Sequence, residues 1–550
     1  MTNLKPIPIG IDNFKELVNK GYYYVDKTDL IEEILTRGAK VNLFPRPRRF
    51  GKTLTISMLE NYFNIKKKEE NENLFCDLKI NNAQQGIREK QGKYPVISLN
   101  LKGVKDDTWK KELNKLKAII SRLYQDNEEV KSLLSLKDQE YYNKIINETA
   151  LEEEYQLSLK NLSIFLANYY KQPTIILIDE YDAPIENGFL NGFYDNAINF
   201  MRNFFGEALK TNEYLNFACM TGILRVSKES IFSGLNNLKI YSILDSQYSE
   251  YFGFVPKEVD KILEDYNIEN KEDIKKWYDG YNFGGTEIYN PWSILNSVDD
   301  RKIQPYWINT GGTSLLENML KTSASDIKQE LEQLLLGECI AVKLNENVVY
   351  SEITGSRENI YNFMLLCGYL TVERVEMQGK YQVGYLRIPN LEVEIAFENM
   401  IERWFQYSTG REEINTLQKA LLVNEREVAE EALNNLMLKC MSFFDNAENF
   451  YHGFVLGLMV DMGNEYIVKS NRESGFGKYD MKIEKKDGTL GIIIEFKTAK
   501  KDSEDKMENM AKEALEQIEK NKYYLDMQER GIKNILMYGV AFNNKKAVLR

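Results

Sequence analysis

Histidine, cysteine and long apolar runs are scarce in this sequence, and each scarcity excludes a class of protein. The 550 residues include one histidine, His452, which excludes zinc sites built from several histidines and any paired-histidine relay. A Ser-His-Asp triad could be built only around that residue. The five cysteines are widely separated and form no Cys-X-X-Cys pair, which favours reduced thiols over a disulfide framework or a zinc ribbon.

Signals for export and membrane insertion are also missing. The first residues lack the apolar segment of a signal peptide. The best candidate for a membrane helix, residues 363–370, falls far short of the roughly 18 apolar residues that a span requires. We therefore expect a cytoplasmic protein with no membrane partner.

The composition is that of a globular protein with an excess of acid. Hydrophobic residues make up 43% of the chain, enough for sizeable cores, and 550 residues predict roughly three or four domains. The 83 acidic and 71 basic residues give a net charge of −12, which disfavours a general nucleic-acid coat protein. Residues 441–550 contain 18 of each sign, so the whole excess lies in residues 1–440.

The hydrophobic pattern divides the chain into three parts. Residues 1–240 alternate helical stretches with short, continuous apolar strands, which predicts an α/β domain with a parallel sheet covered on both faces. Residues 241–440 are mostly helical, and the helix, hairpin and helix expected over 359–405 indicate a winged-helix-like element. Residues 441–550 read as helix, strand, hairpin, helix and strand, a separate α/β domain.

A phosphate-binding loop is predicted near residue 50. The apolar run that starts at Val41 leads into Phe-Pro-Arg-Pro-Arg-Arg-Phe-Gly-Lys-Thr and then into an amphipathic helix. Backbone N–H groups at the helix start would face the phosphates of ATP, together with Arg49 and Gly51. Lys52 would neutralise the β- and γ-phosphate oxygens, and Thr53 would offer its hydroxyl to Mg²⁺. The match to the usual GxxxxGK[ST] spacing is partial, because Arg46 stands where the first glycine is expected.

A second nucleotide motif follows a buried strand at residues 174–178. Asp179 would complete the Mg²⁺ shell and Glu180 would polarise the attacking water, although solvated carboxylates at a strand end give the same pattern. Thr221 follows another strand, where a polar side chain that senses the γ-phosphate often lies. Arg225 could stabilise phosphate charge in cis or in trans; a helix-capping threonine and a surface arginine are the alternatives.

The C-terminal part contains a predicted β-hairpin that pairs two acids. Asp487 and Gly488 form a typical two-residue turn between alternating segments. With that turn, Asp480 lies directly opposite Glu495, and Lys497 shares their face of the hairpin.

Facing carboxylates repel each other unless a cation lies between them, and oxygen ligands favour Mg²⁺. Asp480 and Glu495 are therefore candidate metal ligands. Lys497 could orient a metal-activated water or stabilise the pentacovalent phosphorane of phosphodiester hydrolysis. An exposed polar hairpin face with an incidental Glu-Lys pair is the alternative, and a shift of one residue in register would break the pairing.

Taken together, these motifs resemble a fusion of two known families. The N-terminal part resembles the bacterial AAA-ATPase-like proteins, in which Arg at the first loop-glycine position is typical, and the C-terminal part resembles the PD-(D/E)XK nuclease-like domain. The stretches that carry the resemblance are Tyr24-Val-Asp-Lys-Thr28, Arg46-Pro-Arg-Arg-Phe-Gly-Lys-Thr53, Leu177-Ile-Asp-Glu-Tyr-Asp182, the run from Gly222 to Asn237, Trp277-Tyr-Asp-Gly-Tyr-Asn282, Tyr289-Asn-Pro-Trp-Ser293, Asp480 and Glu495-Phe-Lys497.

The resemblance implies a RecA-like P-loop core and a nuclease fold in which helices flank a mixed sheet. Some related nucleases carry a glutamine on the helix after the ExK motif, which corresponds to Gln517; a solvated glutamine is the plainer interpretation. Glu473 could supply a further acid, or lie in a surface loop.

Three functions remain open. The leading one is an ATP-binding protein, and an ATPase, whose nucleotide state gates a Mg²⁺-dependent nuclease acting on DNA or RNA. The second is a signalling or sensor NTPase switch in defence or mobile-element biology. The third is a catalytically inactive nucleic-acid-binding module, since residues 37–53 contain six basic residues and no acid. The middle region would act as a lid over the nucleotide rather than contact DNA through its wing. The sequence does not indicate the oligomeric state.

Overall fold

The chain contains two compact units, each with its own sheet and core. This computed structural model describes residues 4–225, 237–307, 325–335, 337–398, 411–440, 465–474, 477–498, 504–543 and 546–550, with positions 451, 454–455, 458–459 and 462. The first unit comprises residues 1–311 and 341–393, and the second comprises 312–340 and 394–550. Most of the described middle region thus belongs to the same unit as the N-terminal sheet.

The first unit is built on a five-stranded parallel sheet, as the continuous apolar runs predict. Its strands are β1 (Val41–Pro45), β2 (Val96–Asn100), β3 (Thr174–Asp179), β4 (Leu215–Gly222) and β5 (Leu238–Ile240). They lie in the order β2-β3-β4-β1-β5, and every neighbouring pair is parallel. Because β3, β4 and β1 are adjacent, the residues that follow them meet at one edge, where ligands bind in open α/β sheets.

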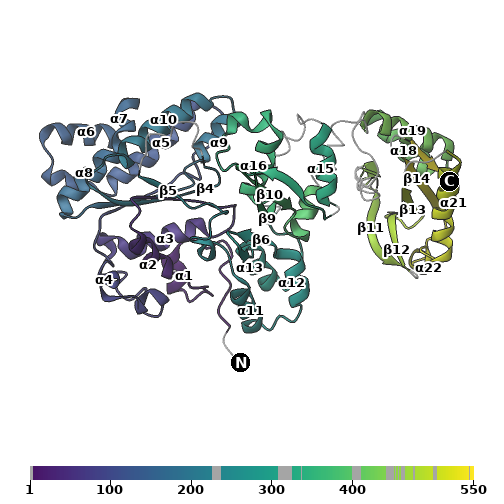
Figure 1. The fold of residues 1–550 in the computed structure, drawn as a ribbon, viewed down its shortest axis with the longest axis horizontal. Coiled ribbons are helices and arrows are strands. Elements are labelled where there is room, and N and C mark those ends of the chain that lie inside the picture. The colour runs from purple at the N-terminus through teal and green to yellow at the C-terminus, as the bar shows by residue number, and fades with distance from the viewer. Residues whose placement is uncertain are drawn as a thin grey trace. The chain divides into compact units, whose positions relative to one another are not determined.

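Helices cover both faces of this sheet (Figure 1). One face carries α1 (Phe14–Asn19), α2 (Asp29–Arg37), α3 (Lys52–Phe63) and α4 (Gln85–Arg88). The other carries α5 (Trp109–Gln125), α6 (Leu136–Ile146), α7 (Glu152–Gln156), α8 (Ser158–Tyr170), α9 (Ala183–Leu190) and α10 (Tyr194–Leu209). This coverage explains why the central strands β1 and β3 are buried along their whole length.

The rest of the first unit is smaller helices and hairpins. They are α11 (Pro256–Asp265), α12 (Lys271–Tyr278), β6 (Tyr281–Phe283), β7 (Thr286–Ile288), α13 (Pro291–Asp300), β8 (Ile340–Lys343), α16 (Arg357–Cys367), β9 (Thr371–Gln378) and β10 (Tyr381–Arg387). A helical segment follows at 391–398. The predicted helix, hairpin and helix are therefore present through residue 398; residues 399–405 of that prediction lie outside the described part of the chain.

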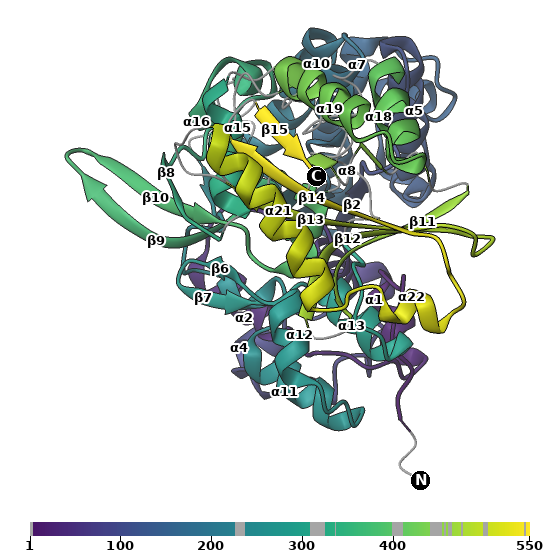
Figure 2. The ribbon, with the colours of Figure 1, turned by 90° about the vertical axis from the view of Figure 1, so that its right-hand side faces the viewer.

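The second unit has a mixed five-stranded sheet, as the resemblance implies. Its elements are α15 (Ser325–Leu335), α18 (Arg411–Leu422), α19 (Arg426–Cys440), β11 (Tyr466–Ser474), β12 (Gly477–Lys485), β13 (Gly491–Thr498), α21 (Glu504–Lys520), α22 (Leu525–Glu529), β14 (Ile535–Asn543) and β15 (Lys546–Leu549). The strand order follows the chain, and only β13 and β14 are parallel. Their connection is α21, which lies across both strands (Figure 2).

The sheet of this unit is packed on both faces. Ala511, Ala514 and Ile518 of α21 are buried, as the helical spacing of apolar residues predicts. Met481 and Ile494 contribute to the core on the other side, together with α18 and α19. Across all described helices of the chain, none combines the length and apolar character needed to span a bilayer.

Candidate functional site

The loop after β1 lies at the carboxyl edge of the first sheet. β1 pairs with β4 so that Pro45 lies beside Gly222, and α3 begins at Lys52 immediately after the loop. Gly51 caps α3 with φ 81°, a left-handed conformation that glycine adopts without strain. The start of α3 opens into a cavity of about 520 Å³, and Gly51, Lys52 and Thr53 all line it. A helix N-terminus in such a position is an anion-binding site.

Lys52 lies inside this loop with its ammonium group turned toward the protein. It is 6% exposed, and its Nζ donates to the carbonyl oxygens of Arg46 (2.9 Å) and Pro47 (2.8 Å). Burial lowers its pKa, and the nearby acids Glu180, Asp182 and Asp179 oppose that shift. Two carbonyl oxygens of the loop thus hold a cation at the helix start, next to the space a phosphate would occupy.

The three arginines of the loop have different environments. Arg46 is buried, donates to the carbonyl of Tyr241 (2.6 Å), and lies 5.0 Å from the ring centroid of Phe252. Burial lowers its pKa to about 9. Arg48 forms an ion pair with Glu186 (2.9 Å). Only Arg49 of the three lines the cavity without a hydrogen bond or ion pair to a described residue.

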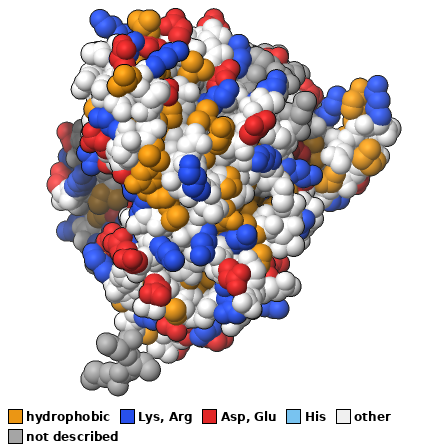
Figure 3. Space-filling view, turned by 90° about the vertical axis from the view of Figure 1, so that its left-hand side faces the viewer, with side chains coloured by type: hydrophobic (Ala, Val, Ile, Leu, Met, Phe, Trp, Pro, Cys, Tyr) orange, Lys and Arg blue, Asp and Glu red, His pale blue; other side chains and the backbone are white. Residues whose placement is uncertain are grey.

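This burial weakens the interpretation of residues 37–53 as a basic surface for nucleic acid. Arg46 is internal, Arg48 is paired, and Arg37 is paired with Glu33 on its own helix. The face shown in Figure 3 likewise intersperses Lys and Arg with Asp and Glu. Most of the positive charge of residues 37–53 is therefore buried or paired within the protein.

The acids after β3 occupy two depths. Asp179 is fully buried; it accepts hydrogen bonds from the Thr221 hydroxyl (2.5 Å) and the Asn100 amide (2.9 Å). Glu180 has φ 52° and its side chain lines the cavity. Thr221 also accepts a hydrogen bond from the Glu180 backbone N–H (3.4 Å). Thr221 thus lies beside both acids, and Glu180 is the nearer of the two to the open space.

Two further acids of the cavity were not singled out from the sequence. Asp182 accepts backbone hydrogen bonds from Ile223 (2.8 Å) and Leu224 (3.0 Å), and burial raises its pKa to about 6. Glu186, on α9, contacts both Arg48 and Lys105. The four-residue spacing of 182 and 186 at a helix start is the signal that could have identified them, because it places both side chains on one face.

Arg225 is not among the described residues that line the cavity. It lies near Glu346, whose pKa burial raises against the opposing charge of Arg225. The structure therefore brings Arg49, Gly51, Lys52, Thr53 and Glu180 to the cavity, sets Asp179 and Thr221 behind its wall, and leaves Arg225 elsewhere.

Residues that follow the sheet in the chain contribute to the cavity wall. Phe254, Trp292 and Leu295 line it, and the Trp307 indole N–H donates to the carbonyl of Arg48 (3.3 Å). Gly368 packs against the loop so closely that a Cβ there would lie 2.9 Å from the Cβ of Pro47. The loop is therefore enclosed by residues that follow it by more than 200 positions.

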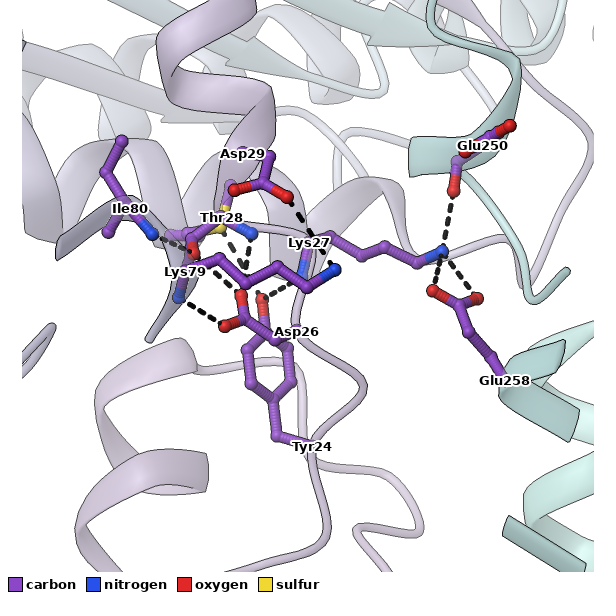
Figure 4. Close-up of polar contacts among 10 residues, drawn as sticks. Tyr24, Asp26, Lys27, Thr28, Asp29, Lys79, Ile80, Glu250 and Glu258 are labelled. Carbon is purple, nitrogen blue, oxygen red and sulfur yellow. Dashed lines mark hydrogen bonds and ion pairs between the residues drawn. The ribbon is translucent and has the colours of Figure 1, made fainter. Parts of the chain in front are cut away.

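Lys27 anchors this region to the sheet domain (Figure 4). Its Nζ donates to the carboxylate of Glu258 on α11 (2.6 Å) and to the carbonyl of Glu250 (2.6 Å). Burial lowers the pKa of Lys27, and Glu258 opposes the shift. Because Lys27 also lines the cavity, this ion pair fixes part of the cavity wall.

The neighbours of Lys27 in the Tyr24-Val-Asp-Lys-Thr28 motif have a structural role. Asp26 accepts hydrogen bonds from the Thr28 N–H (2.9 Å) and hydroxyl (2.7 Å) and from the Lys79 N–H (2.7 Å). Thr28 in turn accepts one from the Ile80 N–H (3.0 Å). Figure 4 shows these bonds joining the start of α2 to residues 79–80.

In the second unit, the hairpin has the register predicted from its turn. Met481 pairs with Ile494, which places Asp480 beside Glu495 at the next position. The Phe496 N–H donates to Asp480 (2.8 Å), and the Asp480 N–H donates to Glu495 (3.3 Å). Burial raises the pKa of Asp480, opposed by the hydrogen bond from Phe496 and by Lys497.

Gln517 connects Glu495 and Lys497, which together with Asp480 form the carboxylate–lysine cluster of the hairpin. Its amide donates to Glu495, and its carbonyl oxygen accepts a hydrogen bond from the Lys497 ammonium (2.6 Å). The interpretation of Gln517 as a solvated side chain is therefore wrong: α21 places it directly over the hairpin. Sequence spacing could not show this, because the contact depends on how α21 returns across β13.

The donor set of this cluster fits Mg²⁺ rather than zinc. Asp480 and Glu495 offer carboxylate oxygens, and Mg²⁺ is commonly held by one or two carboxylates with water. Within the described ranges, no three His, Cys, Asp or Glu residues converge in a metal-binding group. Nothing is described of the Glu473 side chain, the further acid considered from the sequence.

Comparison with known protein families finds a match for the segment that contains each of the two sites. Residues 8–232 match a family model described as a predicted AAA-ATPase, and residues 446–550 match the PD-(D/E)XK nuclease superfamily. The chain joins an AAA-ATPase-like domain to a PD-(D/E)XK nuclease-superfamily domain. The AAA-ATPase-like match contains the loop, Asp179 and Glu180, and the PD-(D/E)XK match contains Asp480, Glu495 and Lys497.

The sequence of a curated relative matches most of this chain. Over 401 residues the chain is 28% identical to an uncharacterized protein in the vnfD 5′ region of Azotobacter chroococcum mcd 1. The match covers 72% of this chain and 70% of that protein.

Proposed function

We propose that this cytoplasmic protein binds and hydrolyses ATP in its AAA-ATPase-like domain and cleaves nucleic-acid phosphodiester bonds with Mg²⁺ in its PD-(D/E)XK domain. The observation that carries the proposal is the convergence of Asp480, Glu495 and Lys497, joined through Gln517, on one face of a hairpin. The cavity at the start of α3 supports the nucleotide part.

In the nucleotide site, each group has a distinct task. The N–H groups at the start of α3 bind phosphate oxygens, and Lys52 leaves its loop carbonyls to neutralise them. Thr53 and Asp179 would hold Mg²⁺ with the phosphates, Asp179 through its water shell. Glu180 orients the water that attacks the γ-phosphorus; the bond to the β,γ-bridging oxygen breaks, and ADP and phosphate leave.

In the nuclease site, Asp480 and Glu495 would hold Mg²⁺, which when bound lowers the pKa of a ligand water and neutralises phosphate charge. Lys497 orients the attacking water and stabilises the added negative charge of the phosphorane. Gln517 keeps Lys497 and Glu495 in place from α21.

Two substitutions test the sites separately. Lys497→Gln should reduce cleavage of DNA or RNA oligonucleotides by at least 100-fold, whereas Asp487→Asn, in the turn of the same hairpin, should cleave at the wild-type rate. Lys52→Met should abolish ATP binding and leave Mg²⁺-dependent cleavage without ATP unchanged. Equal cleavage by Lys497→Gln and wild type would reject the nuclease assignment.

A nucleotide-dependent switch is the second candidate, favoured by the position of Asp179. Because Asn100 and Thr221 hold its carboxylate behind the cavity wall, turnover should be slow. The purified chain would then retain bound nucleotide and release phosphate more slowly than about one per minute. Rapid ATP hydrolysis stimulated by nucleic acid would rule out this candidate.

A further inference from the structure

Arg49 is the loop residue whose side chain is placed to respond to a nucleotide. Its guanidinium lies over the ring of Trp292, whose centroid is 4.2 Å away, and it forms no hydrogen bond or ion pair with a described residue. Arg49 and Trp292 both line the cavity at the start of α3. An arginine stacked on an indole keeps all its N–H donors available for another ligand.

Trp292 is a fixed partner in this contact. Its backbone N–H is bound by the Asn290 side chain at the start of α13 (2.9 Å), and its indole N–H donates to the carbonyl of Tyr306 (3.3 Å). The Tyr306 N–H is in turn bound by the buried carboxylate of Glu392. The indole plane is therefore held from both ends.

The loop backbone around Arg49 is fixed as well. Arg49 has φ 70°, a left-handed conformation that a non-glycine residue keeps only where its surroundings impose it. Phe50 is buried, and Arg48 is held by Glu186 and by Trp307. The backbone here is therefore held by its neighbours, whereas the Arg49 side chain is exposed.

A bound nucleoside triphosphate would compete with Trp292 for this side chain. A charge-assisted, bidentate hydrogen bond between guanidinium and phosphate is stronger than a cation–π contact near solvent. Burial lowers the pKa of Arg49, and Glu180 opposes that shift, so the guanidinium is near the acid proposed to orient the attacking water.

We infer that Arg49 senses the terminal phosphate: its guanidinium rests on Trp292 in the nucleotide-free protein and moves to the γ-phosphate when a nucleoside triphosphate binds. A diphosphate lacks the group that Arg49 reaches and leaves the contact intact. The inference rests on the proposed ATP binding and adds how the site distinguishes ATP from ADP.

Tryptophan fluorescence and equilibrium binding test this in the intact chain. The chain has five tryptophans, so Trp292→Phe isolates the signal of interest and Trp277→Phe, on α12, is the matched control. A non-hydrolysable ATP analogue with Mg²⁺ should change the emission of the wild type and of Trp277→Phe. It should not change that of Trp292→Phe, and ADP should have little effect on any of them.

Arg49→Gln provides the second arm, at an exposed position that leaves the core intact. It should bind the ATP analogue about tenfold more weakly and bind ADP with wild-type affinity, and it should lose the emission change at saturating analogue. An emission change that persists in Arg49→Gln, or equal loss of ATP and ADP affinity, would overturn the inference. If the wild type binds nucleotide without an emission change, the inference about Arg49 is wrong but the proposed ATP binding stands. If the wild type binds no nucleotide, both the inference and the proposed ATP binding are wrong.

Discussion

Asp480 and Glu495 lie opposite each other on β12 and β13, and each accepts a backbone hydrogen bond from the other's strand. The ladder therefore fixes both carboxylates before any metal arrives, and the burial that raises the pKa of Asp480 makes the pair costly to keep charged without a cation. A pair fixed in this way is preorganised for metal binding.

Removing Gln517 tests how this pair is supported. Gln517→Ala removes one hydrogen bond from Lys497 and one from Glu495, so we expect kcat for oligonucleotide cleavage to fall about 10- to 100-fold with little change in KM. Glu516→Ala, on the exposed face of the same helix, is the control and should cleave at the wild-type rate. Wild-type kcat in Gln517→Ala would show that the contact is incidental.

Gly539 determines how closely α21 approaches β14. A Cβ at this position would lie 2.0 Å from the carbonyl oxygen of Ala511, a backbone atom that cannot move without the helix. Gly539→Ala should therefore destabilise the second unit by about 3 kcal/mol in chemical denaturation. Gly206→Ala, in an open position on α10, should leave stability unchanged or slightly raised, and similar behaviour of the two variants would contradict the packing described here.

Glu112 should make the stability of the first unit depend on pH. Its side chain is fully buried on α5 beside Asn187, and burial raises its pKa to about 7. The folded state therefore binds a proton more tightly than the unfolded state, and this contribution is lost as pH rises from about 4.5 through 7.

Glu112→Gln removes that titration. Relative to wild type, the variant should gain roughly 3 kcal/mol of unfolding free energy between pH 4.5 and pH 8. Thermal or chemical denaturation at the two pH values measures the difference. A gap between wild type and variant that is the same at both pH values would contradict the prediction.

The Lys27–Glu258 ion pair is expected to hold α11 against the sheet domain. Lys27→Met leaves Glu258 partly buried without its cation, which should cost about 2–3 kcal/mol of unfolding free energy. The double variant Lys27→Met, Glu258→Gln should recover part of that loss, because it leaves no unpaired charge. If the two single variants are additive in a double-mutant cycle, the pair contributes no coupling.

The sequence predicts best where the determinants are local. The parallel sheet follows from continuous apolar runs such as Thr174–Asp179, and the Asp480–Glu495 pairing follows from a two-residue turn that fixes the register. Each of these two patterns lies within a single short segment of the chain.

Other parts of the sites depend on contacts distant in sequence. In the sequence, Arg46 looks like an exposed cation of the loop. It is buried in the structure because it contacts Tyr241 and Phe252, about 200 residues later. Gln517 meets Glu495 only because α21 returns across the sheet, and Trp292 contacts Arg49 of the nucleotide loop from more than 200 positions further along the chain. No local pattern encodes such contacts, because they are set by the packing of whole elements.

Cleavage of end-labelled DNA and RNA oligonucleotides across a Mg²⁺ titration tests the central claim most directly. The wild-type chain should cleave with Mg²⁺ and stop cleaving when the metal is chelated. Asp480→Asn keeps the shape of the side chain but not its charge, and it should remain below about 1% of the wild-type rate at every Mg²⁺ concentration. Wild-type cleavage by Asp480→Asn, or cleavage by the wild type that does not need a divalent cation, would contradict it.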